Sequence, residues 1–447
     1  MTASLPALTE ALLAAARKAG ADSADALAVS GQSLTVDLRQ GALEQAERAE
    51  GTEIGLRVLI GRRQACVSAS DISAATISAL AERAVAMARE APEDPTAGLA
   101  DPSQLTDRRD AGGLDLCDPS PEPSAARLEA AARAAEAGAL AAKGITQVET
   151  SATWSRREMH LAASNGFAGG YARSSHSLSA VAFCGSGTAM ERDIAGEGRI
   201  YAADMPSDEG IGQLAAERAL ARLGAVKPPT GHFPVLYDER VAASLIGHLL
   251  SAINGTAIAR GASWAGGLMD QPVLPDGIAL TEDPHRVRIG ASRPFDAEGL
   301  ATAPKALVQD GVLKSWVLDL ATARKLGLAS TGNAARGTAA PPSPSTTCID
   351  LTQGGQSRDD LLAAMGTGLL VTSMIGSTIN ATTGDYSRGA SGWWVEGGQL
   401  KYPVHECTIA GNLKDMLRRI VPANDARDHL SFRVPSLLVE GLTIAGS

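Results

Sequence analysis

Hydrophobic positions at the start of the chain recur first at helical spacing and then at strand spacing. Leucines and alanines on one face predict a helix over residues 5–19, which Gly20 ends. A second helix is expected over residues 72–89, opened by Asp71 as its N-cap. Between them, short strands are expected at residues 26–29, 34–38, 54–60 and 64–68, with Gly61-Arg62 as a hairpin turn. Strands grouped before a helix favour an α+β fold over alternating βαβ units.

The pattern continues to about residue 224. Residues 91–123 are rich in Pro, Asp and Gly and predict a long excursion without regular structure. Helices are expected at 125–143 and 211–223, on either side of a strand-like stretch at 147–183. Ser164-Asn165-Gly166 is the turn signal inside that stretch. The segment Gly224 to Gly231, which contains Lys227-Pro228-Pro229, is the expected domain boundary.

The second half has a different pattern of hydrophobic positions. It begins with a strand at 233–237 and a helix from Asp238, and then continues as short strands punctuated by glycine as far as Ile444. Further helices are expected only at 317–326, 358–365 and 412–419. The sequence therefore predicts an N-terminal domain of mixed helix and antiparallel sheet over residues 1–224. A β-rich C-terminal domain is expected over residues 232–447.

Composition and charge narrow the class of protein. The chain has 447 residues with 3% aromatics and 47 glycines, so its cores must be built from Ala, Leu, Val and Ile. Forty Lys and Arg against 50 Asp and Glu give a net charge of −10, and no basic cluster is present. Direct nucleic-acid binding depends on such clusters. We therefore expect no direct nucleic-acid partner.

Cysteine usage and hydropathy indicate the compartment. The five cysteines form no CxxC pair, which favours reduced thiols over disulfides or a zinc ribbon. The apolar patch near Leu12 precedes Arg17 and Lys18, the reverse of the order in a signal peptide. No run approaches the roughly 18 apolar residues that a membrane span needs. A cytoplasmic protein without a membrane segment is expected.

Standard catalytic motifs are missing. The sequence contains no P-loop, no complete GxGxxG and no GxSxG nucleophile elbow. His405-Glu406 could suggest a zinc helix, but the positions one turn later are Ile409 and Ala410 instead of a second histidine. We interpret this pair as part of a strand or turn.

One helix carries a histidine of interest. From Asp238 to Asn254, apolar residues form a stripe along one face, and His248 lies at its border. His248 could contact a substrate or a metal, or it could be a border residue satisfied by a hydrogen bond.

Acidic residues gather in two loops of the second half. Glu282, Asp283 and His285 form one group, and Asp296 with Glu298 forms the other, with arginines between them. Paired acids can perform acid–base chemistry or bind metal, but acids alternating with arginines also serve as loop ion pairs and caps. The glycine-flanked run 385–388 leaves the same two alternatives open.

Longer motifs carry a family resemblance. The runs Thr281–His285 (TEDPH), Pro294–Gly299 (PFDAEG), Thr383–Ala390 (TGDYSRGA) and Ile409–Asp415 (IAGNLKD) resemble the TldD/PmbA family, and within it the TldE-like branch. The resemblance extends more loosely through the first half. It implies a cytoplasmic metallopeptidase system of two related subunits. TldD-like chains hold zinc through an HExxxH helix and a cysteine near the C-terminus. TldE-like chains pair with them and help to enclose a cavity for unfolded peptides.

The same resemblance implies roles in trimming leader peptides and degrading antitoxins, and a link to DNA gyrase. This sequence departs from the TldD pattern at the zinc ligands. Placing the HExxxH helix on residues 244–251 puts Ile246 at the first histidine, Gly247 at the glutamate and Ser251 at the second histidine. The segment 430–434, where the cysteine would lie, has none. A catalytic zinc centre needs three protein ligands and an open position. We therefore expect no zinc and no catalytic residue in this chain.

The hypothesis that follows is a non-catalytic subunit that binds unfolded peptides beside a TldD-like, zinc-containing partner. The expected peptide contacts are His248, Asp385, Tyr386 and Arg388. One alternative is a peptidase with an unrecognised site among the acids at 282–298. The other is a stand-alone homodimer that regulates gyrase or an antitoxin.

Overall fold

A computed structural model describes residues 3–446. Helix α1 (Leu5–Ala19) begins after the N-cap Ser4 and ends at Gly20, as the sequence predicts. Gly20 has a φ of 95°, a left-handed conformation that glycine adopts without a steric penalty. Local signals are therefore sufficient to fix both ends of this helix.

Helix α2 (Ala74–Glu90) begins two residues later than predicted. Its N-cap is Ser73, whose side chain accepts a hydrogen bond from the N–H of Thr76. Asp71, the predicted cap, instead accepts a hydrogen bond from the N–H of Ser73 at 2.9 Å. The prediction of the cap was wrong because serine and aspartate both favour this position and stand two residues apart.

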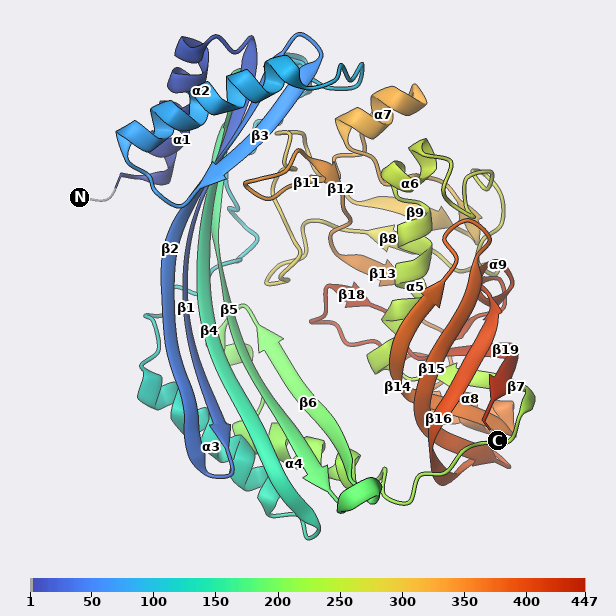
Figure 1. Ribbon diagram of the computed structural model, residues 1–447. Helices are drawn as coiled ribbons and strands as arrows, with labels where there is room; N and C mark the ends of the chain where they lie inside the picture. The colour runs from blue at the N-terminus through green and yellow to red at the C-terminus, as the bar shows by residue number, and fades with distance from the viewer. Residues whose placement is uncertain (1–2, 447) are drawn as a thin grey trace.

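A large antiparallel sheet forms one wall of the molecule (Figure 1). Its strands are β1 (Ser23–Arg39), β2 (Ala42–Ile60), β3 (Arg63–Ala69), β4 (Ile145–Ala163), β5 (Ala168–Cys184) and β6 (Glu191–Arg199). They follow the order β3-β2-β1-β4-β5-β6. The predicted turns at Gly61-Arg62 and at 164–166 join β2 to β3 and β4 to β5.

The strands are much longer than the predicted ones. β1 has 17 residues and unites the two strands expected at 26–29 and 34–38. In β2, residues 42–53 are almost entirely exposed. An extended ribbon with solvent on both faces needs no alternation of apolar and polar residues, and alternation was the signal available.

Two helix pairs cover one face of this sheet. Ala24, Ala26 and Ala28 of β1 pack on α1 and α2, whereas Leu34 and Val36 pack on a second helix pair farther along the strand. That pair is α3 (Ala125–Leu140) and α4 (Asp208–Leu220). Because these strand positions are all even-numbered, both pairs lie on the same face.

The contact between α3 and α4 depends on a glycine. A Cβ at Gly212 would lie 1.7 Å from the carbonyl oxygen of Ala135. The two helices can approach this closely only because the position has no side chain.

The opposite face of the sheet turns toward the second half of the chain. At one end, Leu27 and Leu161 form an apolar cluster with Phe167 and Phe295, whose ring centroids are 5.0 Å apart. Farther along, the same face carries partly exposed hydroxyl residues such as Thr35, whose Oγ1 lies 3.1 Å from that of Thr153.

The second half is β-rich and holds two further sheets. The larger sheet has the order β16-β15-β14-β7-β19-β17: β7 (Gly231–Tyr237), β14 (Gly368–Ile379), β15 (Asp385–Glu396), β16 (Gln399–Asn412), β17 (Val421–Pro422) and β19 (Leu437–Ala445). The smaller has the order β10-β9-β8-β13-β18: β8 (Leu280–Glu282), β9 (Lys305–Gln309), β10 (Val312–Leu313), β13 (Ile349–Leu351) and β18 (Phe432–Arg433). A two-stranded ribbon, β11 (Ala334–Ala335) with β12 (Ser343–Pro344), lies beside them. The expected α+β fold with a β-rich C-terminal part is confirmed.

Helices are short in this half. They are α5 (Glu239–Ala252), α6 (Gly255–Ala259), α7 (Leu320–Leu326), α8 (Arg358–Met365) and α9 (Leu413–Leu417). Single-turn 3₁₀ helices occur earlier in the chain, at η1 (Pro102–Gln104), η2 (Gly187–Ala189) and η3 (Ala202–Asp204). No helix between residues 3 and 446 has the length and apolar character needed to cross a bilayer.

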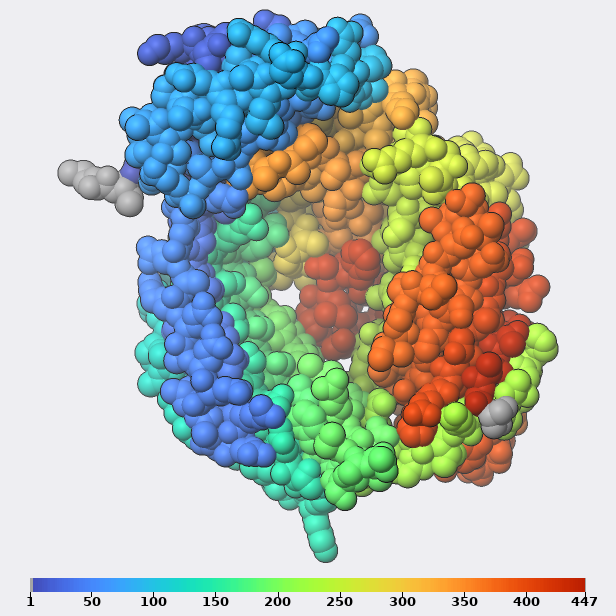
Figure 2. All heavy atoms as spheres, viewed as in Figure 1, coloured from blue at the N-terminus to red at the C-terminus, as the bar shows by residue number. Residues whose placement is uncertain are grey.

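The two halves face each other across a hollow. In Figure 1, the long sheet stands on one side, β14, β15 and α5 stand on the other, and the halves meet at both ends. The space-filling view in Figure 2 shows that the middle stays open, with the dark red region around β18 at the back. This arrangement places one face of the long sheet and the β14 side of the second half on the same internal space.

Candidate functional site

Helix α5 lies on the side of the second half that borders the hollow (Figure 1). It starts after Asp238, whose side chain caps the N–H of Arg240, and it follows β7 directly. Leu245, Ile246 and Leu249 are fully buried in the main core of this half. The predicted apolar stripe therefore faces inward, and the opposite face of the helix remains open.

The three positions expected to lack zinc ligands lie on different sides of α5. Ile246 is buried in the core, so its side chain points away from the open face. Gly247 has no side chain, and a Cβ there would meet no atom within 4 Å. Ser251 is exposed, and its hydroxyl donates to the carbonyl oxygen of Gly247 at 2.8 Å.

These residues do not fit a zinc ion. A catalytic zinc needs imidazole, carboxylate or thiolate donors, and an isoleucine, a glycine and a hydroxyl engaged within its own helix supply none. In the segment 430–434, the carbonyl of Leu430 accepts from Arg286 at 3.0 Å, and Phe432–Arg433 pairs with β13. Among residues 3–446, no three His, Cys, Asp or Glu side chains come together as a metal-binding group.

His248 lies on α5, at the border between its buried face and its open face. Its ring packs edge-on against Tyr386, with the ring centroids 5.8 Å apart. Its Nε2 atom is buried and has no hydrogen-bond partner among the described residues. Burial lowers the pKa of His248 and the nearby Arg388 lowers it further, so the imidazole is neutral at pH 7. A neutral histidine with an unused ring nitrogen can accept or donate a hydrogen bond, according to its tautomer.

Tyr386 and Arg388 extend from the same face of β15. Tyr386 is 2% exposed, and its phenol oxygen lies 3.5 Å from that of Tyr237 in β7. Burial raises the pKa of both phenols. Tyr386 thus supports His248 from beneath, whereas Arg388 reaches the surface and donates from Nε to the carbonyl of Gly376 at 2.8 Å.

Asp385 points away from this group. Successive side chains of a strand alternate between faces, so Asp385 lies on the opposite side from Tyr386. Its carboxylate accepts hydrogen bonds from Thr383 Oγ1 at 2.6 Å and from Asn412 Nδ2 at 3.1 Å. Three of the four expected peptide contacts therefore gather near α5, and Asp385 organises the adjoining turn.

The sequence analysis missed the free edge of β14. This strand pairs with β7 only as far as Val371, and beyond that point the described residues place no strand on that side. Ser244 of α5 contacts Met374 of β14, with 3.8 Å between Oγ and Sδ. Ile375, one residue farther, is 78% exposed. The signal in the sequence at this point was the apolar pair Met374-Ile375 before Gly376.

The acids of the two loops, by contrast, all accept hydrogen bonds from the chain itself. Glu282 is 1% exposed and accepts hydrogen bonds from Asn333 Nδ2 at 2.9 and 3.0 Å, from the N–H of Thr347 at 2.6 Å and from Lys305 Nζ at 3.1 Å. Asp283 caps the N–H of His285, whose Nε2 lies 3.0 Å from Thr302 Oγ1.

The second acidic group is equally engaged. Asp296 accepts from the N–H groups of Glu298, Leu300 and Ala334. Glu298 Oε2 accepts from the N–H of Leu320 at 2.8 Å. Burial, and then the charge of Asp296, raise the pKa of Glu298 to about 8. These hydrogen bonds hold the loop from Asp296 to Leu300 and the start of α7 in place.

Comparisons with known proteins agree over most of the chain. Family profiles described as PmbA/TldA metallopeptidase domain 1, central domain and C-terminal domain match residues 24–88, 116–223 and 230–446. The chain is 37% identical to metalloprotease PmbA of Escherichia coli, covering 92% of this chain and 90% of that protein. It is 33% identical to a PmbA homologue of Haemophilus influenzae, covering 97% and 94%.

Solved structures share the fold. A Bacteroides thetaiotaomicron protein described as a modulator of DNA gyrase superimposes with a TM-score of 0.90 at 28% identity, over 98% of each chain. TldE from Thermococcus kodakarensis gives a TM-score of 0.83 at 19% identity, over 98% of this chain and 100% of that one. The extent of the sequence match decides the assignment: the chain belongs to the PmbA/TldD metallopeptidase family.

Proposed function

We propose that this chain is the non-catalytic, TldE-like subunit of a two-subunit metallopeptidase. In this proposal it holds an unfolded peptide, and a TldD-like partner carries the zinc. The observation that carries the proposal is that the three positions placed on the zinc motif hold Ile246, Gly247 and Ser251, none of which offers a zinc donor. Without zinc donors, the chain cannot supply the metal of a metallopeptidase site, so in this proposal the partner supplies it.

The free edge of β14 supports the binding role. An unpaired strand edge offers alternating N–H and C=O groups, which can take up an extended peptide as an added strand. Main-chain pairing of this kind reads extended shape more than sequence, which suits unfolded substrates. Ser244, one turn before His248 on α5, contacts Met374 at this edge, and Arg388 donates to the carbonyl of Gly376. In the proposal, His248 and Arg388 contact the peptide.

Reconstitution tests the catalytic part of the proposal. The purified chain, a TldD-like chain from the same genome and their mixture are assayed for zinc content and for cleavage of an unfolded peptide. We expect zinc in the TldD-like chain, none in this chain, and cleavage by the mixture. Stoichiometric zinc with turnover by this chain alone would overturn the proposal.

N-methylated peptides test the strand pairing. Two versions of one labelled peptide carry N-methyl groups on alternate residues, in opposite registers. One of the two peptides carries its N-methyl groups on the residues whose N–H groups would donate to β14. Only this peptide should lose affinity, by roughly tenfold or more, because methylation removes those backbone hydrogen bonds. Equal binding of both versions would rule out pairing to this edge, while leaving the subunit assignment intact.

A second candidate function rests on the structural relative described as a modulator of DNA gyrase. In that case the chain acts alone or as a homodimer on gyrase or on an antitoxin. Its net charge of −10 favours contact with protein over contact with DNA. A change in gyrase supercoiling activity on adding the chain without any partner would favour this function.

A further inference from the structure

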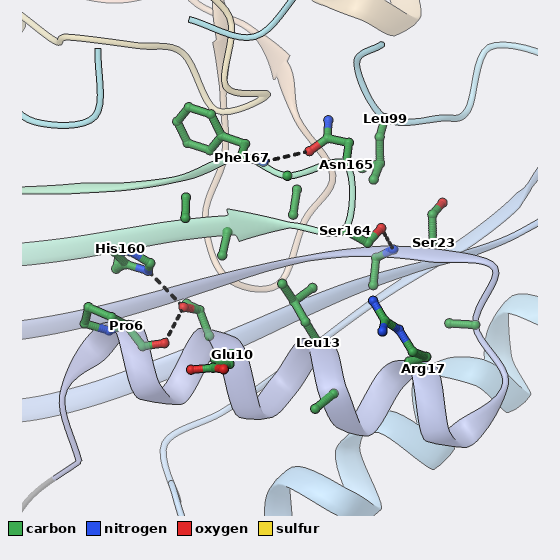
Figure 3. Close-up of a pocket in the computed structure, with 18 of the residues that line it drawn as sticks. Pro6, Glu10, Leu13, Arg17, Ser23, Leu99, His160, Ser164, Asn165 and Phe167 are labelled. Carbon is green, nitrogen blue, oxygen red and sulfur yellow. Dashed lines mark hydrogen bonds between the residues drawn. The ribbon is translucent and has the colours of Figure 1, made fainter. Parts of the chain in front are cut away.

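A groove lies on the outer side of the long sheet, between α1 and the turn that joins β4 to β5 (Figure 3). Its cavity volume is about 880 Å³, within the range of small-molecule sites. His160 and Ala162 of β4 line it and share the face on which Trp154 packs with α3 and α4. The groove therefore opens on the face of the sheet turned away from the hollow.

At one end of the groove, Arg17 and Ser164 offer hydrogen-bond donors that suit an anion. The guanidinium of Arg17 points from α1 toward the β4–β5 turn (Figure 3) and has no ion pair with another described residue. Ser164 Oγ accepts a hydrogen bond from the N–H of Ala24 at 3.0 Å, which leaves its hydroxyl hydrogen for a ligand. Asp22, the nearest acid in the lining, accepts from the N–H of Gly61 at 2.7 Å.

The other end is prepared for a cation. Glu10 is exposed there and has no ion pair with another described residue. The hydroxyl of Thr9 donates to the carbonyl of Pro6 at 2.9 Å, so the 2.8 Å contact with His160 makes Nδ1 of His160 the donor. Because burial lowers the pKa of His160, the ring is neutral and its Nε2 keeps an acceptor lone pair.

The distance between the two charged ends determines the length of the ligand that fits. Glu10 and Arg17 are seven residues apart on α1, which places them on the same face about 10 Å apart along the helix axis. Three extended residues span about the same length at roughly 3.3 Å each. Between the ends, the lining includes Leu13 and Ala14 of α1 and Ala162 of β4, an apolar stretch without charge.

We propose that this groove binds a free peptide of about three small residues by its two charged ends. The carboxylate lies at Arg17 and Ser164, and the ammonium lies at Glu10 and His160. The small side chains contact the alanines of both walls. Binding requires both free termini, so this site selects short peptides and rejects internal segments of long chains.

Calorimetry on the full chain tests the proposal with trialanine as the probe. We expect saturable binding of one trialanine per chain, weakened roughly tenfold or more by N-acetylation or by C-terminal amidation, since each cap removes a charge-assisted contact. Arg17→Ala should make the free acid and the amide bind equally. Glu10→Gln should make the free and the acetylated amine bind equally.

Arg83→Ala on α2 is the matched control, because Arg83 is also an exposed helix arginine but lies outside the groove. It should leave the preference for free termini unchanged, and thermal unfolding should show that all variants are folded. Absence of saturable binding overturns the proposal, and so does equal binding of capped and free peptides or an effect of Arg17→Ala no larger than the control. The assay uses the chain without partner or zinc, so its failure leaves the proposed subunit role untouched.

Discussion

The open face of α5 and the acidic loops at 282–298 both concentrate polar side chains in the second half, yet their hydrogen bonding is opposite. Each carboxylate in the loops accepts at least one hydrogen bond from the chain itself, and Glu282 and Asp296 accept at both oxygens. On α5, His248 keeps a buried ring nitrogen that no described residue satisfies.

This difference separates structural from functional polar groups. A buried acid whose acceptors are filled by its own chain stabilises loops and has nothing left for a ligand. A buried nitrogen without a partner costs free energy, and a ligand that supplies the partner recovers that cost. We therefore expect the acidic cluster, although it resembles a catalytic site in sequence, to matter more for stability than for function.

Removal of Glu282 should give the largest effect. In Glu282→Ala, the amide of Asn333 and the ammonium of Lys305 lose the buried carboxylate that both contact. We expect a loss of about 3–5 kcal/mol in unfolding free energy, measured by urea denaturation. Glu217→Ala, at an exposed glutamate of α4, should change stability by less than about 0.5 kcal/mol. A loss below about 1 kcal/mol for Glu282→Ala would contradict the interpretation that Glu282 stabilises the folded chain.

The pH dependence of stability should follow Glu298. Its pKa in the folded protein, about 8, is above the ordinary value of 4.5, so folding favours the protonated form. The contribution of the protonated Glu298 carboxyl to the unfolding free energy is complete below pH 4.5 and is lost as the pH rises through 8. The unfolding free energy falls over this range by at most about 1.4 kcal/mol per pH unit.

Glu298→Gln should remove this slope and stabilise the protein at pH 8.5. The glutamine carbonyl can still accept from the N–H of Leu320. Urea midpoints at pH 6 and pH 8.5 measure the slope, and Glu217→Gln serves as the control. The same slope in Glu298→Gln and in the unaltered chain would show that Glu298 is ionised in the folded state.

His248 should show the reverse behaviour, with function affected more than stability. In His248→Phe the ring contact with Tyr386 is kept while the unsatisfied nitrogen is removed. We expect a stability change within about 1 kcal/mol, together with a severalfold rise in KM for an unfolded peptide and an unchanged kcat in the complex with a TldD-like partner. His232→Phe, at a histidine of β7 that contacts Thr443, is the control. An unchanged KM for His248→Phe would remove His248 from the peptide site.

Local patterns in the sequence predicted the helices well. The predicted helix at 358–365 coincides with α8, and Ser4 with Gly20 sets the ends of α1. Capping and periodicity act within one or two turns, so they can be read from neighbouring residues. The full lengths of β1 and β2 could not be predicted, because residues 42–53 are held by pairing with β1 and not by a buried face of their own.

The candidate site was predictable only in part. The sequence pattern placed His248 at the border of the apolar stripe on α5. The contact of His248 with Tyr386, however, joins segments far apart in the chain. Asn333 and Thr347, which donate to Glu282, are 51 and 65 residues away, so no local pattern could reveal that this acid is satisfied. Whether a polar residue is structural or functional depends on these long-range partners, which periodicity does not report.

Ser251 should give the smallest effect. Its exposed hydroxyl donates only to Gly247 of its own helix, a bond that water can replace. Ser251→Ala should therefore change the unfolding free energy by less than about 0.5 kcal/mol, since alanine also has the higher helix propensity. Peptidase activity of the complex should be unaltered, because the hydroxyl supplies neither a zinc ligand nor a proton. A fall in activity without a fall in stability would show that the open face of α5 works through Ser251 as well as His248, and would extend the peptide site along the helix by one turn.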